Sequence, residues 1–202
     1  GYTKVDAKQK TKLVQNVFSR VAVNYDNMND FMSLGMHRLW KKRFVEIIDC
    51  KNNEKILDVG SGSGDIAFEI TKTKTPVYLH LLDLNKEMLK EGKKRLKNKK
   101  NIKFIIGNGE NLKLKSNYFD KYAIAFCLRN ITNIELSIKE AHRVLKPGGK
   151  YCCLEFSSPK SSLMSHTYKV YKSNILPFLG EVIAKDKDAY KYLSESIDLF
   201  PN

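Results

Sequence analysis

The sequence has few cysteines, no long apolar run and no leader-like start. Its cysteines, Cys50, Cys127, Cys152 and Cys153, form no CxxC pair and have no metal-ligand spacing with the histidines, so we expect no metal site. Adjacent Cys152 and Cys153 would point to opposite faces of a strand, which is typical of a reduced, buried strand in an intracellular protein. No run approaches the roughly 18 apolar residues that a membrane-spanning helix needs. No charged segment followed by an apolar one opens the chain as a secretory signal would.

Arginine is also scarce: only 6 of the 36 basic residues are arginine, although the formal net charge is +14. Base recognition and bidentate phosphate contacts favour arginine, and the lysines are spread over the whole chain, so we expect no nucleic-acid partner. Most of this charge is interpreted as a solvated surface. The densest cluster, residues 93–100, ends a predicted helix, where cations complement the helix dipole. Attraction to an anionic membrane surface is the alternative that we carry forward.

A length of 202 residues suits one domain with a sizeable core. We predict an N-terminal helical lid over residues 1–50, a cofactor-binding core over 51–158 and a helical substrate-side segment over 159–202. The core alternates strands, expected at 55–59, 77–83, 102–106, 119–126 and 150–156, with helices, expected at 65–72, 85–97 and 134–145. This alternation predicts an α/β, Rossmann-like fold with a mostly parallel sheet and helices on both faces. The fifth strand would lie at an open edge, so we expect C-terminal strands to be missing beyond Asn202.

The strongest chemical signal is a glycine-rich turn, Asp58-Val59-Gly60-Ser61-Gly62-Ser63-Gly64-Asp65, between a strand and a helix. Its glycines let the backbone turn tightly and come close to a ligand. A dinucleotide fingerprint needs a third glycine at position 65, where Asp65 would repel a pyrophosphate. The pattern therefore favours a nucleoside with a cationic amino-acid tail and no phosphate, and a tight structural loop is the alternative.

Polar residues follow the next two strands. Asp83 stands 19 residues beyond Gly64, where an acid can hold both ribose hydroxyls. The third strand ends before Gly107-Asn108-Gly109-Glu110, which could present polar groups to an adenine edge. The carboxyl ends of parallel strands open into one crevice, the usual ligand site of open α/β sheets. Together these features resemble the class I S-adenosylmethionine-dependent methyltransferases.

Longer segments resemble the ubiquinone/menaquinone biosynthesis C-methyltransferase family nearly end to end. They read VAVNYDNMND at 21–30, GMHRLW at 35–40, LRN at 128–130, RVLKPGG at 143–149 and YLSESI at 192–197. The resemblance implies a set of contacts to S-adenosylmethionine, which becomes S-adenosylhomocysteine: Asp58, Gly60, Gly62, Ser63, Gly64, Asp83, Leu84, Asn108, Gly109 and Ala125. Two positions depart from the family, which usually has glycine at Cys127 and in many members a hydroxyl residue at Ala125.

The implied reaction is C-methylation of a reduced polyprenyl benzoquinol in ubiquinone or menaquinone biosynthesis. Losing a phenolic proton, with a reference pKa of about 10, makes the ring carbon nucleophilic. We expect Arg129 to stabilise the developing oxyanion and Asn130 to position a hydroxyl or water that takes the proton. His37 and Tyr25 are candidates for a base or a lid. The alternatives are a surface ion pair for Arg129 and a polar helix-cap residue for His37.

Two other functions stay open: an RNA methyltransferase, suggested by charge alone, and a scaffold subunit that binds the cofactor without turnover. No Asn- or Asp-Pro-Pro-aromatic motif of an amino-methylating enzyme follows the fourth strand, and Cys127 follows Phe126 rather than the usual proline of a nucleophilic cysteine. We interpret Cys127 as a small residue lining the crevice.

The expected partners are the quinol substrate, an anionic membrane surface, a quinone-biosynthesis complex and a second copy of the chain. Apolar side chains between Met164 and Ile183 either line a tunnel for the isoprenoid tail or pack helices on the sheet. Because the chain begins with Gly1 rather than methionine, we expect a trimmed upstream segment. That favours the matrix side of the mitochondrial inner membrane, with the bacterial cytoplasm as the alternative.

Overall fold

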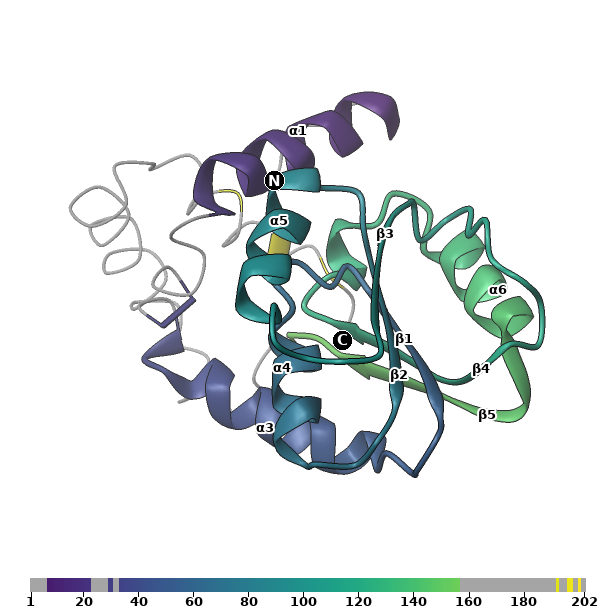
Figure 1. Cartoon of the computed structure of the whole chain (residues 1–202). Coiled ribbons are helices and arrows are strands. Elements are labelled where there is room, and N and C mark those ends of the chain that lie inside the picture. The colour runs from purple at the N-terminus through teal and green to yellow at the C-terminus, as the bar shows by residue number, and fades with distance from the viewer. Residues whose placement is uncertain are drawn as a thin grey trace, which may run out of the picture.

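A five-stranded parallel sheet forms the centre of the computed structural model, which describes residues 7–22, 29–30, 33–156, 192, 196–197 and 200. The strand order is β3-β2-β1-β4-β5, and every neighbouring pair is parallel. The strands are β1 (Lys55–Val59), β2 (Tyr78–Asp83), β3 (Ile102–Ile106), β4 (Phe119–Ala125) and β5 (Leu145–Leu154). The predicted fold class, a mostly parallel α/β sheet, is confirmed (Figure 1).

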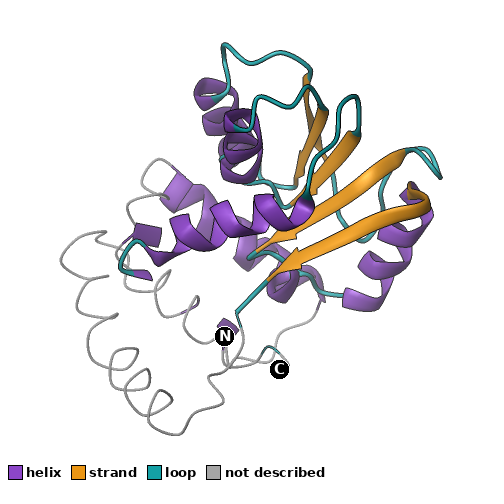
Figure 2. Ribbon diagram, turned by 90° about the horizontal axis from the view of Figure 1, so that it is seen from below, coloured by secondary structure: helices purple, strands orange, loops and turns teal. Residues whose placement is uncertain are grey.

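The helices cover both faces of this sheet (Figure 2). One face packs against α3 (Met36–Ile48), α4 (Asp65–Lys72) and the end of α5 (Lys86–Arg95), and the other packs against α6 (Ile134–Val144). The central strands are apolar because both of their faces are buried: Ile56 and Leu81 face α3 and α4, whereas Leu57 faces α6. The sequence pattern of near-continuous apolar runs therefore corresponds to a sheet that is covered on both sides.

Asparagine caps fix where two of these helices begin. The Asn85 Oδ1 atom accepts hydrogen bonds from the backbone amides of Glu87 (3.0 Å) and Met88 (3.1 Å) at the start of α5. The Asn133 Oδ1 atom likewise accepts from the Leu136 amide (3.0 Å) at the start of α6. Such caps satisfy amides that have no partner inside the helix. The prediction of Asn85 as an N-cap is confirmed, and the helix it starts ends earlier than expected, at Arg95.

The expected fifth strand was placed too late in the chain. β5 begins at Leu145, which pairs with Phe119, and a register shift separates this pair from the next, Lys121 with Lys150. The segment 146–149 is therefore an irregular part of a strand rather than a turn before it. Pro147 is tolerated there because β5 lies at the edge of the sheet, where proline need not donate to a neighbour.

The cysteine pair on β5 confirms the expected alternation but corrects the expected burial. Cys152 is buried against the α3 and α4 side, whereas Cys153 is exposed. All four cysteines are free.

The N-terminal part is helical, as predicted. α1 (Ala7–Val21) packs against α5, and α3 packs against α4. No helix in the described part of the chain is both long and apolar enough to span a bilayer. The predicted substrate-side segment, 159–202, lies almost entirely outside the described residues, and so does the proposed tail tunnel between Met164 and Ile183.

Candidate active site

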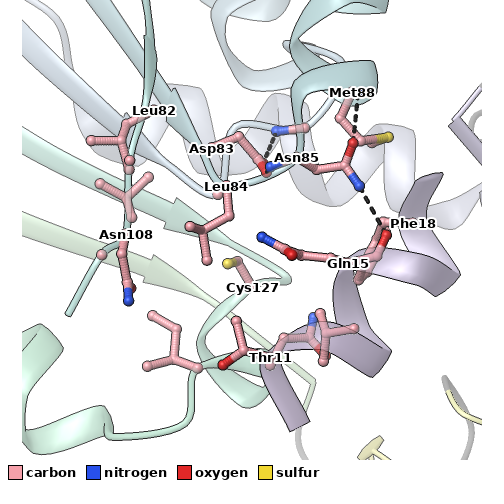
Figure 3. Close-up of a pocket in the computed structure, with 18 of the residues that line it drawn as sticks. Thr11, Gln15, Phe18, Leu82, Asp83, Leu84, Asn85, Met88, Asn108 and Cys127 are labelled. Atoms are coloured by element: carbon pink, nitrogen blue, oxygen red, sulfur yellow. Dashed lines mark hydrogen bonds between the residues drawn. The ribbon is translucent and has the colours of Figure 1, made fainter. Parts of the chain in front are cut away.

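A cavity lies at the carboxyl ends of β1, β2 and β4, with α1 across its opening (Figure 3). Each of these strand ends, and the turn after β3, contributes to its wall, as open parallel sheets predict. The residues that line it are Thr11, Val14, Gln15, Phe18, Val59, Gly60, Gly62, Leu82, Asp83, Leu84, Asn85, Met88, Gly107, Asn108, Gly109, Glu110, Ala125, Phe126, Cys127, Asn130, Ile131 and Thr132. The crevice expected from the sequence is therefore present.

Gly60 shapes the floor of this cavity. Its φ is +66°, and a Cβ atom there would collide with the Cys127 side chain, standing 2.6 Å from the Cys127 Cβ atom. The Gly60 and Ser61 amides both donate to the Leu82 carbonyl, at 2.8 and 3.1 Å. Only glycine fits a left-handed turn pressed this closely against a neighbour. The turn is thus held against the end of β2, next to Asp83.

The Asp83 carboxylate is fixed by backbone amides at the cavity wall. Its Oδ2 atom accepts from the Gly62 amide (2.8 Å) and its Oδ1 atom accepts from the Asn85 amide (2.7 Å). Burial raises the pKa of Asp83, and the amide hydrogen bonds act against this rise. The acid is thereby oriented before any ligand arrives, which is the arrangement expected of a group that holds ribose hydroxyls.

Asp58 lies beneath the turn rather than in the cavity wall. It is only 1% exposed, and its Oδ2 atom has no hydrogen-bond partner. Burial, followed by repulsion from Asp83, raises the pKa of Asp58 to about 7, with Lys41 opposing the rise. An unpaired buried carboxylate costs free energy, so this end of the cavity is electrostatically ready for a positive charge.

The residues present fit S-adenosylmethionine. The cavity wall carries the carboxylates of Asp83 and Glu110, and among its described lining residues there is no lysine or arginine. This set is suited to a ligand with a sulfonium and an ammonium group and is poorly suited to a pyrophosphate. Ser61 adds a buried hydroxyl oxygen without a partner next to the same turn.

From the sequence we expected Asp65 to repel a pyrophosphate at the cavity, and the structure corrects this reason. The Asp65 carboxylate does not face the cavity: it is paired with Lys41 of α3 and Arg95 of α5. Two cations therefore neutralise it and tie three helices together. The preference against a pyrophosphate rests instead on the described lining, which has no lysine or arginine, and on the buried Asp58 carboxylate beneath the turn.

Helix α1 is attached at both sides of the cavity. On one side, the Asn85 Nδ2 atom donates to the Gln15 carbonyl (3.0 Å) and the Ser19 Oγ atom (2.8 Å). On the other side, the Lys10 Nζ atom donates to the Ile131 carbonyl (2.9 Å). The face between these attachments presents Thr11, Gln15 and Phe18 to the cavity (Figure 3). Part of the predicted N-terminal lid thus contributes directly to the ligand site.

Arg129 is placed differently from the expectation of a cation facing the reacting ring. It does not line the cavity, and its guanidinium pairs with Glu155 (2.7 Å) while donating to the Phe126 carbonyl (2.6 Å) and the Ser196 hydroxyl (3.3 Å). Phe126 has a φ of +53°, which is strained for a bulky residue. The structure therefore shows Arg129 as a buried ion-pair partner that holds the turn after β4. The alternative, an ion pair, is present, but the pair is buried and does not lie at the surface.

Asn130 is the predicted catalytic residue that does reach the cavity. Its side-chain oxygen accepts a hydrogen bond from the Tyr192 hydroxyl at 2.9 Å. His37 lies elsewhere, on α3, where its Nε2 atom is 2.8 Å from the Asp30 carboxylate. Burial, with Lys41 nearby, lowers the pKa of His37. Tyr25 lies outside the described residues.

Cys127 lines the cavity, as expected for a small residue of the crevice. Burial, together with the nearby Asp83 carboxylate, raises the pKa of its thiol, so the protonated form dominates at neutral pH. A protonated thiol is a weak nucleophile. No group of three or more His, Cys, Asp or Glu side chains that could hold a metal occurs among the described residues.

Most of the ten predicted cofactor residues converge on the cavity. Those that line it are Gly60, Gly62, Asp83, Leu84, Asn108, Gly109 and Ala125. Besides Asp58, two do not: Ser63 faces Arg95 (3.4 Å), and a Cβ at Gly64 would meet Leu96 and Leu81. No sequence motif marked the face of α1 that lines the cavity, Thr11, Val14, Gln15 and Phe18, although its i, i+3, i+4, i+7 spacing is that of one helical face.

Comparison with known proteins gives a consistent result. Residues 4–202 match the model of the ubiE/COQ5 methyltransferase family. The chain is 50% identical over 209 residues to the ubiquinone/menaquinone biosynthesis C-methyltransferase UbiE of Rickettsia prowazekii, covering all of this chain and 84% of that protein. It is 49% identical to the protein of the same name from Rickettsia bellii, with the same coverage.

Solved structures share the fold at low sequence identity. A putative S-adenosyl-L-methionine-dependent methyltransferase from Methanococcus maripaludis has a TM-score of 0.62 at 16% identity, covering 98% of this chain and 87% of that one. A putative methyltransferase from Bacillus halodurans has a TM-score of 0.56 at 19% identity, covering 78% and 67% of the two chains.

Proposed function

The chain belongs to the ubiE/COQ5 methyltransferase family, and on this premise we propose that it transfers a methyl group from S-adenosylmethionine to a ring carbon of a reduced polyprenyl benzoquinol. The observation that carries the proposal is the half-buried carboxylate of Asp83, fixed by two backbone amides beside the Gly60 turn, in a cavity whose described lining has no lysine or arginine. Its relatives carry the name of ubiquinone/menaquinone biosynthesis, so either type of quinol precursor is a candidate acceptor.

When bound, S-adenosylmethionine supplies an electrophilic methyl group on a sulfonium and leaves as the neutral thioether S-adenosylhomocysteine. We assign Asp83 to the ribose hydroxyls, Asn108 and Gly109 to the adenine, and the Gly60–Gly64 turn to the methionine part. The carboxylates of the buried Asp58 and the half-buried Asp83 favour binding of the positively charged cofactor. The turn 107–110 and one face of α1 also line the cavity around the proposed cofactor position.

The acceptor must be activated on the other side of the methyl group. A water held by Asn130 removes a proton from a ring hydroxyl, which pushes electron density onto the neighbouring carbon. The electron pair of that carbon forms the new carbon–carbon bond while the carbon–sulfur bond breaks onto sulfur. The proton on the methylated carbon then passes to water, and its bonding electron pair restores the aromatic ring. Asn130 lies in the turn after β4, where its backbone amide donates to the Cys127 carbonyl at 2.9 Å.

Location and partners follow from the same proposal. An isoprenoid tail keeps the acceptor in or near a bilayer, and the net charge of +14 supports attraction to an anionic membrane face. The reported relatives are bacterial, so we propose the cytoplasmic side of a bacterial membrane; the mitochondrial matrix stays a prediction. A quinone-biosynthesis complex and a homodimer also stay predictions.

The decisive experiment has two stages. The first is a calorimetric titration with S-adenosylhomocysteine, with NADH and ATP as controls; we expect micromolar binding of S-adenosylhomocysteine alone. The second is incubation of the protein and S-adenosylmethionine with a short-chain prenyl benzoquinol kept reduced, analysed by mass spectrometry for one added methyl group on carbon. Binding without transfer to any reduced quinol would contradict the enzyme and favour a scaffold subunit. RNA binding with a steep salt dependence, followed by RNA methylation, would favour the RNA methyltransferase.

A further inference from the structure

Two residues near the end of the chain contact the turn that follows β4. Tyr192 donates from its hydroxyl to the Asn130 Oδ1 atom at 2.9 Å, and Ser196 accepts from the Arg129 Nε atom at 3.3 Å. They contact Asn130 and Arg129 across 62 and 67 residues of sequence. Tyr192 and Ser196 therefore help to fix this turn, whose Asn130 lines the cavity.

The direction of the Tyr192 hydrogen bond fixes the orientation of the amide. Burial raises the pKa of Tyr192 to about 12, with the Arg129 charge acting in the opposite direction, so the phenol keeps its proton and acts as a donor. The donor occupies the side-chain oxygen of Asn130, and the NH2 group must point elsewhere. The titratable and charged groups around this pair are Arg129, Glu155, which is ion-paired with it, and Cys127.

The NH2 group of Asn130 is left for a ligand. Among the described residues, none accepts a hydrogen bond from this NH2 group. Its nitrogen atom is also not fully buried, so a ligand can reach it. Asn130 and Cys127 both line the cavity, and in the proposed function this part of the lining faces the acceptor ring. An amide with its oxygen already occupied is a pure donor, which suits an oxygen that gains negative charge.

We propose that Tyr192 is a positioning residue of the acceptor site, which holds the Asn130 amide with its NH2 group toward the cavity so that this group donates to the ring oxygen of the acceptor as it becomes a phenolate. The inference rests on the proposed function, and it adds a residue that does not itself line the cavity. The ligand chemistry it selects is a phenol or quinol rather than an amine, because a protonated amine has no lone pair to accept from the NH2 group.

The first test measures ionisation in the bound state without any methyl transfer. 4-Nitrophenol, whose phenolate absorbs visible light, is titrated with pH in the presence of saturating protein and S-adenosylhomocysteine. The wild-type protein should lower the pKa of the bound probe, and Tyr192→Phe should return it toward the free value by about one unit, a tenfold weaker preference for the phenolate. If the pKa of bound 4-nitrophenol were the same in the two proteins, the proposal would be overturned, whether or not the protein catalyses the proposed reaction.

The second test uses turnover and a double-mutant cycle. We expect Tyr192→Phe to lower kcat for the reduced quinol about ten- to a hundredfold with unchanged affinity for S-adenosylhomocysteine, and to move the rising limb of the pH profile to higher pH. Rates are given per S-adenosylhomocysteine-binding site, so that a loss of folded protein does not count as a loss of catalysis. In an Asn130→Ala background, removal of the Tyr192 hydroxyl should have no further effect.

The matched control is Tyr78→Phe. It removes a tyrosine hydroxyl at the start of β2, the end far from the cavity, and should behave as the wild type in both tests. A loss in Tyr192→Phe that persists in full in the Asn130→Ala background would mean that the hydroxyl acts only on stability, which contradicts the proposal. Failure of the wild-type protein to methylate any quinol would contradict the proposed function, whereas the nitrophenol titration decides on Tyr192 independently.

Discussion

Arg129 and Glu155 form an ion pair in which the two side chains are only 4% and 6% exposed. Glu155 also accepts from the Arg129 backbone amide at 3.2 Å, so the pair joins the turn after β4 to the residue after β5. Removing one partner leaves the other charge buried without compensation, which typically costs about 3–5 kcal/mol. The pair therefore has a structural role, whatever its effect on the reacting ring.

We expect Arg129→Ala to lower the free energy of unfolding by about 3–5 kcal/mol, measured by urea denaturation. Arg43→Ala is the control, since Arg43 pairs with Glu46 at the surface, where such pairs contribute about 0–1 kcal/mol. If Arg129→Ala were as stable as Arg43→Ala and only turnover were lost, the residue would be a catalytic cation after all.

Asp58 should make the ligand-free protein less stable as the pH rises. Its pKa is about 7 in the folded protein and 3.8 when unperturbed, so the folded state holds a proton that the unfolded state has released between these values. The free energy of unfolding therefore falls as the pH rises from about 4 to about 7. At 1.36 kcal/mol per pKa unit, the fall is roughly 4 kcal/mol, and Asp58 causes no further change above about pH 7. Asp58→Asn should remove this loss in urea denaturation across pH 4 to 8. An unchanged pH profile in the variant would show that Asp58 is not the group responsible.

The same residue should make cofactor affinity depend on pH. A bound cation favours the ionised form of Asp58, so S-adenosylmethionine should bind more tightly as the pH rises toward about 7, and its affinity should level off above that value. Calorimetry on Asp58→Asn should show weaker binding with a flatter pH dependence. Asp49→Asn, at an exposed position paired with Lys51, is the control and should match the wild type.

Gly60 and Cys127 should be energetically coupled. Gly60→Ala introduces a methyl group that collides with the Cys127 side chain. It also places alanine at a positive φ, a backbone conformation that residues with a β-carbon rarely adopt. We expect loss of S-adenosylhomocysteine binding in Gly60→Ala and partial recovery in the double variant Gly60→Ala/Cys127→Gly, since the collision is relieved but the backbone strain persists. Equal losses in the single and double variants would mean that the contact is unimportant.

Cys127→Ala alone should keep methyl transfer within a few-fold of the wild type, because a half-buried, protonated thiol takes no part in the proposed reaction. Turnover of the reduced quinol is the measurement. Complete loss of activity with intact cofactor binding would instead point to a cysteine nucleophile.

The attachment of α1 should control access to the cavity. Ser19→Ala removes one acceptor of the Asn85 side chain but leaves the Asn85 cap of α5 in place. We expect a few-fold weaker binding of S-adenosylhomocysteine and faster amide hydrogen exchange in α1, with little change in global stability. Ser116→Ala, at an exposed hydroxyl near Arg143, is the control. Equal exchange rates in α1 for both variants would exclude a lid attached through Asn85.

Local patterns were sufficient for much of the fold and for part of the site. The strands Lys55–Val59 and Ile102–Ile106 and the helix Asp65–Lys72 were predicted with the observed bounds, because apolar runs, caps and glycines act over a few residues. The convergence of Gly60, Asp83 and Asn108 followed from the rule that parallel strands end at one edge. The start of β5 was missed, because pairing with β4 at the sheet edge extends the strand through Pro147 and Gly148.

What the sequence determined by itself is the order of strands and helices, the glycine turn and the family, since each is encoded in neighbouring residues. Tertiary structure decided where the charges act. Only packing shows that Lys41 and Arg95 neutralise Asp65, that Glu155 occupies Arg129 and that Tyr192 orients Asn130. These pairs join residues 24 to 62 positions apart. No local pattern fixes such partners, because a charge or amide is available to a ligand only when no distant residue has already bound it.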